Sequence, residues 1–405
     1  MGEAPEAFIE RTARENQFYR EFYSGARDLQ YTSLPFLTKS AILQDQLAHP
    51  PLGNNLGISR DEIKRIHRTS GTSDRPLLIA LTAADERLVI DSGARAFRTA
   101  GVSSSDIVVN CMNYCMWMGG FMDHLSLEAA GACVVPYGVG QTEGLVKLLL
   151  SLERPSIHAT PSYLSKIREV LKDRFGMLPR DLDLSKGFFG GESGLQDESF
   201  RRSIEQEWGM SAINANYGLS EVISILGAEC PFRKGLHFTA APHLYLELID
   251  GDLQTVPLCE GARGELVVTT LQKQAQPLIR YRTGDVLEVL NMGHCECGEP
   301  SFTFNLVGRT DDMLVVKGIN FFPETVRPLL CDYPGLTGSF TVVVEDHDPI
   351  EAVTLVLECS DITQAESIRK SISSSLKSAL YFSPDIEFVE RIEWVGNKRK
   401  LVKRI

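Results

Sequence analysis

A charged turn between two glycines carries the densest set of reactive side chains in the sequence. Gly308 and Arg309 are followed by the adjacent carboxylates Asp311 and Asp312, and a short apolar run then ends at Gly318. The apolar run is typical of a buried strand, and the polar residues before it are typical of a tight turn. An arginine at such a turn can bind a nucleotide, whereas a hairpin with a solvated charge cluster would have the same composition.

A loop near residue 70 is rich in groups that bind phosphate. Residues 68–76 read Arg-Thr-Ser-Gly-Thr-Ser-Asp-Arg-Pro. Glycine lets backbone N–H groups point inward, hydroxyls donate to phosphate oxygens, and Arg75 supplies positive charge. The segment lacks the Gly-Lys-Ser/Thr ending of a Walker loop. It therefore predicts polyphosphate binding of another kind, with an ordinary surface loop as the alternative.

Three further segments place small or polar residues after expected strands. Residues 188–192 (Phe-Phe-Gly-Gly-Glu) and 216–221 (Asn-Tyr-Gly-Leu-Ser-Glu) let the backbone approach a planar ligand. Tyr217 suits stacking on a base, and Glu221 suits coordination of Mg²⁺ together with phosphate oxygens. Asp285, after a Thr-Gly turn, suits a ribose because one carboxylate can accept both hydroxyls.

The third of these segments also holds two arginines. Arg280 and Arg282 lie just before the Thr-Gly turn. These two arginines could instead have a purely structural role, in which they pair with acidic residues of the sheet.

Three cysteines and a histidine have the composition of a metal site. Cys230 and His237 flank a short turn, and Cys295 and Cys297 lie in another. Thiolates and imidazoles are the ligands of closed, tetrahedral zinc sites. Two facts weaken the prediction: His294 is a rival ligand, and unpaired cysteines are often simply buried.

The elements that must position these residues alternate between helices and short apolar strands. That alternation runs from about residue 60 to 250 and indicates a layered α/β fold. Beyond Thr239, strands joined by turns predict a β-rich subdomain that ends near residue 308. Beyond Arg309 a smaller α+β unit is expected, with a helix at residues 363–380. The other expected strands lie at residues 107–109, 132–135 and 156–159, and the other expected helices at residues 83–99 and 144–152.

Composition narrows the class of protein. The chain has 405 residues, a formal net charge of −12 and 43% hydrophobic residues, which suits two or three globular domains. The negative charge argues against nucleic acid as a partner. No apolar run is long enough to span a bilayer, and the acidic start lacks the order of a signal peptide. Together with nine cysteines read as thiols or metal ligands, these features predict a cytoplasmic protein.

The motifs occur in the order and spacing of the adenylate-forming superfamily of acyl-CoA synthetases. Within it, the chain most closely resembles the phenylacetate–CoA ligase family, from about Phe18 to the C-terminus. The most specific segments are residues 214–221, 280–285 and 308–323. The resemblance implies an ATP- and carboxylate-binding domain at residues 1–308, with the β-rich subdomain at about 239–308, and a mobile domain at residues 309–405.

The resemblance also implies roles for single residues. Glu221 would bind Mg²⁺, Asp311 would be the hinge, and Lys398 would be the catalytic lysine that neutralises charge as the acyl-phosphate bond forms. Glu221 and Arg309 would join Lys398 in catalysis. Asp74 and Asn397 depart from the family pattern, where glycine is usual. The implied ATP- or AMP-binding residues are Thr69, Ser70, Gly71, Thr72, Ser73, Arg75, Gly191, Glu192, Asn216, Tyr217, Gly218, Asp285 and Arg309.

A segment dense in aromatic rings and sulfur would form the carboxylate pocket. Residues 113–122 suit core packing equally well, but in the family this segment follows the strand beside the acyl group. Tyr114, Trp117 and Phe121 would then be walls for a flat, apolar acid, and Gly190 and Gly218 would leave room for its ring. The family likeness also favours structural zinc at the cysteine cluster.

The implied reaction is an acid–thiol ligation. The chain would convert a small aromatic or other apolar carboxylic acid to an acyl-adenylate with ATP and Mg²⁺, release pyrophosphate, and pass the acyl group to coenzyme A. Two alternatives stay open: transfer to a carrier-protein phosphopantetheine or an amine, and a binding protein without turnover. A homodimer also stays open.

Overall fold

The fold is that of a computed structural model that divides into two compact units. Unit 1 comprises Met1–Glu192, Glu205–Thr283 and Leu287–Asn305, and unit 2 comprises Ser193–Ile204, Gly284–Val286 and Leu306–Ile405. The domain boundary at residue 308 stays a prediction. The residues described are 5–25, 30–69, 76–192, 194–293, 295–316, 319–331, 333, 335–345, 350, 352–392 and 401–405.

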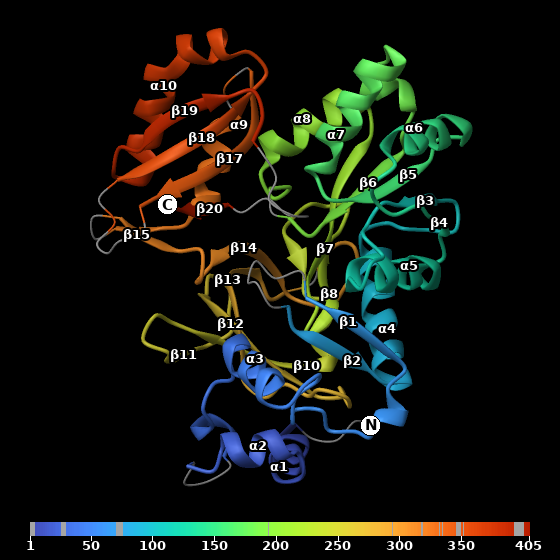
Figure 1. The fold of residues 1–405 in the computed structure, drawn as a ribbon, viewed down its shortest axis with the longest axis vertical. Helices are drawn as coiled ribbons and strands as arrows, with labels where there is room; N and C mark the ends of the chain where they lie inside the picture. Colours follow the sequence, from blue (N-terminus) through green and yellow to red (C-terminus); the bar gives the residue numbers. More distant parts are fainter. Residues whose placement is uncertain are drawn as a thin grey trace. The chain divides into compact units, whose positions relative to one another are not determined.

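Parallel strands form one end of the sheet of unit 1 (Figure 1). These strands run in the order β4-β3-β5-β6-β7, all parallel. The strands are short and apolar because helices cover them, as is usual for parallel sheets. Three expected strands are confirmed. The bounds are β3 (Ile107–Asn110), β4 (Cys133–Pro136), β5 (Ser156–Ala159), β6 (Lys186–Gly190) and β7 (Ser211–Leu219).

The helix that precedes β3 begins at a side-chain cap. Thr82 accepts hydrogen bonds from the backbone of Ala84 and Asp85, and the Asp85 carboxylate accepts from the Thr82 backbone, so α4 (Ala83–Thr99) starts in a capping box. Phe97, Leu127 and Phe188 belong to the core beneath α4 and the following helix, α5. The remaining helices are α5 (Met118–Ala130), α6 (Thr142–Ser151), α7 (Tyr163–Val170) and α8 (Glu198–Trp208).

The same sheet continues as antiparallel strands. Twelve described strands join in the order β11-β10-β12-β13-β14-β9-β8-β7-β6-β5-β3-β4. Antiparallel pairing already begins at β8 rather than after residue 239, because β8 folds back directly beside β7. The bounds are β8 (Ile223–Glu229), β9 (Leu236–His237), β10 (Leu244–Ile249), β11 (Thr255–Val256), β12 (Arg263–Thr270), β13 (Tyr281–Asn291) and β14 (Thr303–Arg309).

The described residues before α4 include the helices α1, α2 and α3 and the hairpin of β1 and β2. The buried hydroxyl of Tyr19 donates to the Pro277 carbonyl at 2.9 Å and accepts from the Ile279 backbone at 2.9 Å. These two bonds fix the N-terminal helices to the segment that precedes β13. The bounds are α1 (Pro5–Glu15), α2 (Gln17–Phe22), α3 (Lys39–Ala48), β1 (Arg65–Arg68) and β2 (Leu78–Leu81).

Unit 2 has its own four-stranded sheet, in the order β19-β18-β17-β20, with α9 and α10 (Figure 1). Its core includes Leu330, Val342 and Leu355. The apolar run after the charged turn is strand β15, but Val315 is 45% exposed, so only one face of the run is buried. The bounds are β15 (Leu314–Val316), β16 (Ile319–Phe321), α9 (Val326–Cys331), β17 (Leu336–Val344), β18 (Val353–Cys359), α10 (Ile362–Leu380), β19 (Asp385–Val389) and β20 (Val402–Arg404).

Among the helices in the described part of the chain, none is long and apolar enough to cross a membrane.

Candidate functional site

The carboxyl ends of the parallel strands gather the segments that the sequence singles out. The aromatic segment follows β3, Gly191 and Glu192 follow β6, and Glu221 follows β7 by two residues. Ligands of open α/β sheets bind at this edge. The topology of unit 1 therefore places three predicted segments at one edge of one sheet.

The base of the phosphate loop (residues 69–75) is closed by Thr69. Its backbone N–H donates to the Leu77 carbonyl at 2.9 Å, and its hydroxyl oxygen accepts from the Leu77 N–H at 3.1 Å. This pair extends the β1–β2 hairpin by one step and fixes both ends of the loop. Ser70, Gly71, Thr72, Ser73, Asp74 and Arg75 lie outside the described residues.

Two predicted nucleotide residues make contacts within the protein. The Glu192 carboxylate accepts from the Ser162 hydroxyl at 2.6 Å and from the Ser162 N–H at 3.1 Å. The Tyr217 ring is 7% exposed and packs edge-on against Phe304, with centroids 5.3 Å apart. Base stacking by Tyr217 stays a prediction.

Asn216 binds a buried acid that the sequence did not single out. Its amide donates to the Asp123 carboxylate at 2.6 Å, and Asp123 also contacts His158 Nε2 at 3.1 Å and the Ser224 hydroxyl at 2.8 Å. Asp123 and His158 are fully buried. This network joins α5 to the segment that contains Tyr217. A lone Asp on an apolar helix gave no sequence signal for it.

Glu221 is held by three groups from distant parts of the chain. Its Oε1 accepts from the Tyr281 hydroxyl at 2.7 Å and lies 3.4 Å from Lys39 Nζ, and its backbone carbonyl accepts from Lys273 Nζ. Burial pushes the pKa of Glu221 up, but Lys39 and Tyr281 outweigh it and lower that pKa. Burial also lowers the pKa of Lys273 to about 8. Sequence reasoning missed both lysines, because neither lies in a recognisable motif.

In unit 2, the charged turn brings three predicted residues together. Arg309 Nη1 donates to the Asp285 carboxylate, and Arg309 also binds Asp311 through Nε at 2.8 Å and Nη2 at 3.0 Å. Asp285 is 3% exposed, and Gly284 before it adopts a φ of +78°. Burial alone would lower the pKa of Arg309, but the two aspartates raise it. Asp285 is thus a buried acceptor beside a guanidinium at a tight turn.

The neighbouring arginines have the structural role that the sequence left open. Arg280 binds Glu247 through Nε at 3.2 Å and Nη2 at 2.8 Å. Arg282 Nη2 lies 2.6 Å from Glu265. Both arginines therefore pair with acids of the same sheet, Arg280 with β10 and Arg282 with β12.

The aromatic segment lies against β1. The Tyr114 hydroxyl is bonded to Asn110 Nδ2 at 2.9 Å and to His124 Nδ1 at 3.1 Å, and burial raises the pKa of Tyr114 to about 12. Trp117 is half-buried, whereas Phe121 is 37% exposed. Tyr114, Trp117 and Phe121 stay predicted pocket walls. Gly190 packs so closely on Asn216 that a Cβ would overlap it, and a Cβ on Gly218 would overlap the Ser224 carbonyl.

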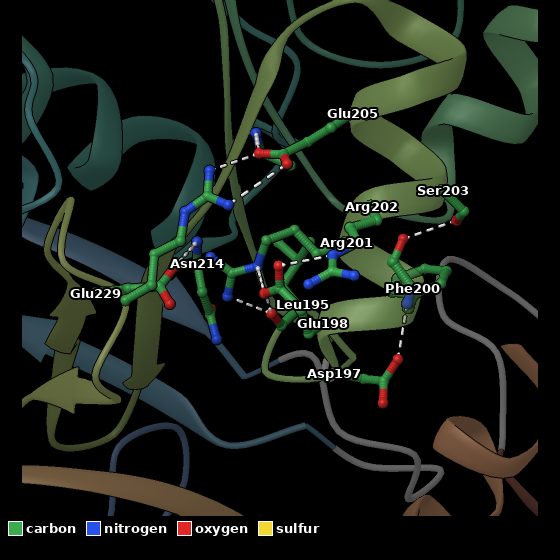
Figure 2. A network of polar contacts seen from close by, with 12 residues as sticks. Leu195, Asp197, Glu198, Phe200, Arg201, Arg202, Ser203, Glu205, Asn214 and Glu229 are labelled. Carbon is green, nitrogen blue, oxygen red and sulfur yellow. Dashed lines mark hydrogen bonds and ion pairs between the residues drawn. The ribbon is translucent and has the colours of Figure 1, made fainter. Parts of the chain in front are cut away.

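The loop after Glu192, in unit 2, is anchored by the first turns of α8 (Figure 2). The guanidinium of Arg201, which is 2% exposed, donates from Nε to the Leu195 carbonyl at 3.1 Å. Asp197 accepts from the Phe200 N–H at 2.7 Å and so caps the helix. These contacts fix the backbone that leaves the predicted adenine segment.

The four predicted zinc ligands converge in unit 1. Their ligand atoms all lie within 4.8 Å of one another, from Cys230, His237, Cys295 and Cys297. Cys230 and Cys295 sulfurs are 3.7 Å apart, and Cys297 sulfur is 3.4 Å from His237 Nε2. His237 Nδ1 faces the Ser301 carbonyl at 3.4 Å, which leaves Nε2 as the free lone pair beside the thiols. His294 lies outside the described residues.

Comparisons with known proteins agree with this architecture. Residues 318–405 match the family of AMP-binding enzyme C-terminal domains. The phenylacetate-coenzyme A ligase of Thermus thermophilus is 34% identical over 342 residues, which are 84% of this chain and 74% of that protein. The phenylacetate-coenzyme A ligase of Escherichia coli K12 is 30% identical over 353 residues, which are 83% of this chain and 77% of that protein.

A solved structure shares the fold over the whole chain. The crystal structure of 2-hydroxyisobutyryl-CoA ligase in the postadenylation state has a TM-score of 0.87 and covers 99% of this chain and 88% of its own, at 24% identity. The fold is therefore that of adenylate-forming ligases, as the motifs predict. With relatives at 30–34% identity over more than four fifths of its length, the chain belongs to the phenylacetate–CoA ligase family of adenylate-forming enzymes.

Proposed function

We propose that the chain is an AMP-forming acid–thiol ligase that activates a carboxylic acid with ATP and transfers it to coenzyme A. The observation that carries this proposal is the 34% identity to a phenylacetate-coenzyme A ligase across 84% of the chain. In the first half-reaction a carboxylate oxygen bonds to the α-phosphorus and pyrophosphate leaves. In the second, the thiol sulfur bonds to the acyl carbon, AMP leaves, and the thiol proton passes to solvent.

Asp285 and Arg309 are proposed to hold the nucleotide. Asp285 is a buried carboxylate that Arg309 contacts, and a carboxylate can accept hydrogen bonds from both hydroxyls of a ribose. Arg309 lies against Asp285 and places a positive charge beside it. Thr69 and the loop it closes are proposed to receive the phosphates.

Glu221 is proposed to bind Mg²⁺. Its lowered pKa keeps it ionised, and a carboxylate oxygen is the ligand that Mg²⁺ prefers. Bound there, Mg²⁺ would neutralise phosphate charge as pyrophosphate leaves. The chain's own part is to hold the carboxylate still, through Tyr281 and Lys39 on the side chain and Lys273 on the backbone.

Two proposed roles concern the C-terminal residues. Lys398 is the proposed catalytic lysine and lies, with Asn397, outside the described residues. Asp311 is the proposed hinge between half-reactions. Both assignments rest on the family's motif order, together with the match of residues 318–405 to its C-terminal domain.

The acid is proposed to be small and aromatic or otherwise apolar. Tyr114 supports this, because its hydroxyl is already bonded to Asn110 and His124, so its ring is what remains to line a pocket. A carrier-protein or amine acceptor, a homodimer and a cytoplasmic location stay predictions of the sequence.

Structural zinc is proposed at the cysteine cluster. Two thiolates on one zinc ion lie about 3.8 Å apart, given tetrahedral Zn–S bonds of about 2.3 Å, which fits the spacing of Cys230 and Cys295. The ion would link the β8–β9 turn to the loop before β14. Metal analysis of protein purified without added zinc should give about one zinc per chain, and chelation should lower the thermal midpoint. A zinc content near zero would refute the site.

An exchange assay tests the function directly. ATP–pyrophosphate exchange is measured with a panel of aromatic and short aliphatic acids, and products are identified by mass spectrometry with and without coenzyme A. We expect exchange with at least one aryl acid and an acyl-CoA product. Exchange without acyl-CoA would favour another acceptor, and no exchange with any acid would favour a binding protein.

A further inference from the structure

Strand β1 and the start of α5 are joined at one point in unit 1. The Arg68 N–H donates to the Met116 carbonyl at 2.9 Å, and Arg68 forms an isolated parallel bridge with Trp117. Trp117 is the residue before α5 begins at Met118. Two segments almost 50 residues apart in sequence, the base of the phosphate loop and the predicted acyl segment, therefore meet at this bridge.

The backbone at this junction is strained. Met116 adopts a φ of +64°, a left-handed conformation that costs a non-glycine residue about 1–3 kcal/mol and clusters at ligand sites. Its carbonyl also lies 3.3 Å from His67 Nδ1, so β1 holds the strained peptide with two contacts. The Met116 side chain is 46% exposed, so burial of that side chain does not account for the strain. What the turn achieves is the placement of Trp117 beside Arg68.

Two buried N–H groups at this junction have no acceptor among the described residues. They are Arg68 Nε and Trp117 Nε1, and the Arg68 guanidinium carbon lies 5.2 Å from the Trp117 ring centroid. Both groups can only donate hydrogen bonds, and a buried donor left unpaired costs about 1–3 kcal/mol. No ion pair to Arg68 is found within the described part of the chain. The pair therefore needs an acceptor, and the guanidinium charge favours an anionic one.

A second arginine of β1, Arg65, also stacks on an aromatic ring, but its charge has partners inside the protein. The Arg65 guanidinium carbon lies 4.0 Å from the Phe121 ring centroid. Arg65 also lies 3.5 Å from the Glu86 carboxylate and 3.5 Å from Met122 sulfur. Its charge is thus met inside the protein, and phenylalanine has no N–H. Of the two stacked pairs, only Arg68 and Trp117 combine a charge with two unmatched donors.

We propose that Arg68 and Trp117 form an oxyanion-binding subsite between the phosphate loop and the acyl segment. The ligand is a terminal oxyanion of a substrate, held by the guanidinium and the indole N–H. Two substrates can supply this group: an acid that carries a second carboxylate, and the terminal phosphate of ATP. The inference rests on the proposed function and deepens it, because it names a group on the substrate.

The experiment uses the full chain and three variants. Arg68→Gln removes the charge, Trp117→Phe removes only the indole N–H and keeps a ring, and Arg65→Gln is the matched control. In that control Lys64 still lies 3.1 Å from Glu86, so no buried carboxylate loses all its partners. KM values in the exchange assay are compared for ATP, benzoate, phenylacetate and their ring-carboxylated counterparts.

For a dicarboxylate ligand, Arg68→Gln should raise the KM of one dicarboxylate about 10–100-fold, as expected for a charged hydrogen bond of about 1.5–3 kcal/mol. Trp117→Phe should raise the same KM by a smaller factor. In Arg68→Gln, the KM values of the monoacids and of ATP should stay at their wild-type values. For a phosphate ligand, both variants should raise the KM of ATP instead. Arg65→Gln should change neither the KM of the dicarboxylate nor the KM of ATP.

The proposal is overturned if Arg68→Gln and Trp117→Phe leave all these KM values within twofold of wild type. It is equally overturned if the KM values of all substrates rise together while the thermal midpoint falls. Failure of the proposed function looks different, because wild-type protein would then support exchange with none of the acids. In that case calorimetric binding of ATP and of the dicarboxylates to wild type and Trp117→Phe still tests the subsite.

Discussion

At the residue scale, the carboxylate of Glu221 is held in place by side chains from distant parts of the chain. Lys39 and Tyr281 meet at its Oε1, and Lys273 holds its backbone from behind. Lys39 is 42% exposed while Glu221 is 9% exposed, so the lysine is the partner that can swing away. A metal that binds Glu221 must therefore displace or share a position with Lys39.

Replacing Lys39 tests that competition. Lys39→Met should lower the Mg²⁺ concentration for half-maximal exchange about 2–5-fold, because an exposed ion pair is worth up to about 1 kcal/mol. The control is Lys64→Met, since Lys64 is 49% exposed and pairs with Glu86 at 3.1 Å. Exchange rates are measured against free Mg²⁺. A higher Mg²⁺ requirement in Lys39→Met would contradict the prediction.

Asp285 offers a second test at the residue scale. Asp285→Asn should raise the KM for ATP about 10-fold or more, because an amide presents one acceptor where the carboxylate presents two. Glu265→Gln is a close control: its ion pair with Arg282 has side chains 5% and 28% exposed, against 4% and 33% for Asp285 and Arg309. Equal KM values in the two variants would sink the ribose assignment.

At the scale of elements, one ion pair ties the two sides of the parallel sheet. Asp106, just before β3, binds Lys186 of β6 at 2.9 Å and 3.0 Å and accepts from the Ser103 N–H at 2.8 Å. Burial raises the pKa of Asp106, but these hydrogen bonds prevail and lower it. The ion pair between Asp106 and Lys186 thus connects β3 and β6, two strands whose carboxyl ends lie at the candidate site.

This pair predicts a pH-dependent stability. The pKa of Asp106 is lower in the folded state than in the unfolded state, where it is about 3.9. The contribution of Asp106 to the free energy of unfolding is therefore full above about pH 3.9, and it is lost as the pH falls through the folded-state pKa. Asp106→Asn should cost about 1–3 kcal/mol of unfolding free energy at pH 7. Urea unfolding at pH 7 and at pH 3 should show that the difference in unfolding free energy between wild type and Asp106→Asn is smaller at pH 3. A difference that persists or grows there would refute the assignment.

At the scale of the whole molecule, the proposed hinge at Asp311 can be tested by measuring the two half-reactions separately. Asp311→Pro should slow thioester formation more than adenylation, because proline fixes φ at a residue proposed to rotate between the steps. Asp311→Ala separates this effect from loss of the contacts with Arg309. Single-turnover rates of each half-reaction provide the measurement. An equal loss in both, or equal effects of the two variants, would count against a hinge.

The sequence predicted the fold well where local pattern and topology agree. Strands at residues 107–109, 132–135 and 156–159 are present because short apolar runs between amphipathic helices have one stable arrangement. It failed at β8, where the residues that follow Glu221 are uniformly buried. Periodicity cannot distinguish a strand buried on both faces from a helix of similar length.

The amino-acid sequence by itself determined the motifs, their order and the family, because these depend on residue types at fixed spacings. Tertiary structure decided which groups surround them. Lys39 and Lys273 reach Glu221 from 182 and 52 residues away, and the Asp123 network and the Arg68–Trp117 pair join equally distant segments. Such contacts leave no local trace, because a side chain's partner across a sheet depends on how strands pair and not on its neighbours in the chain.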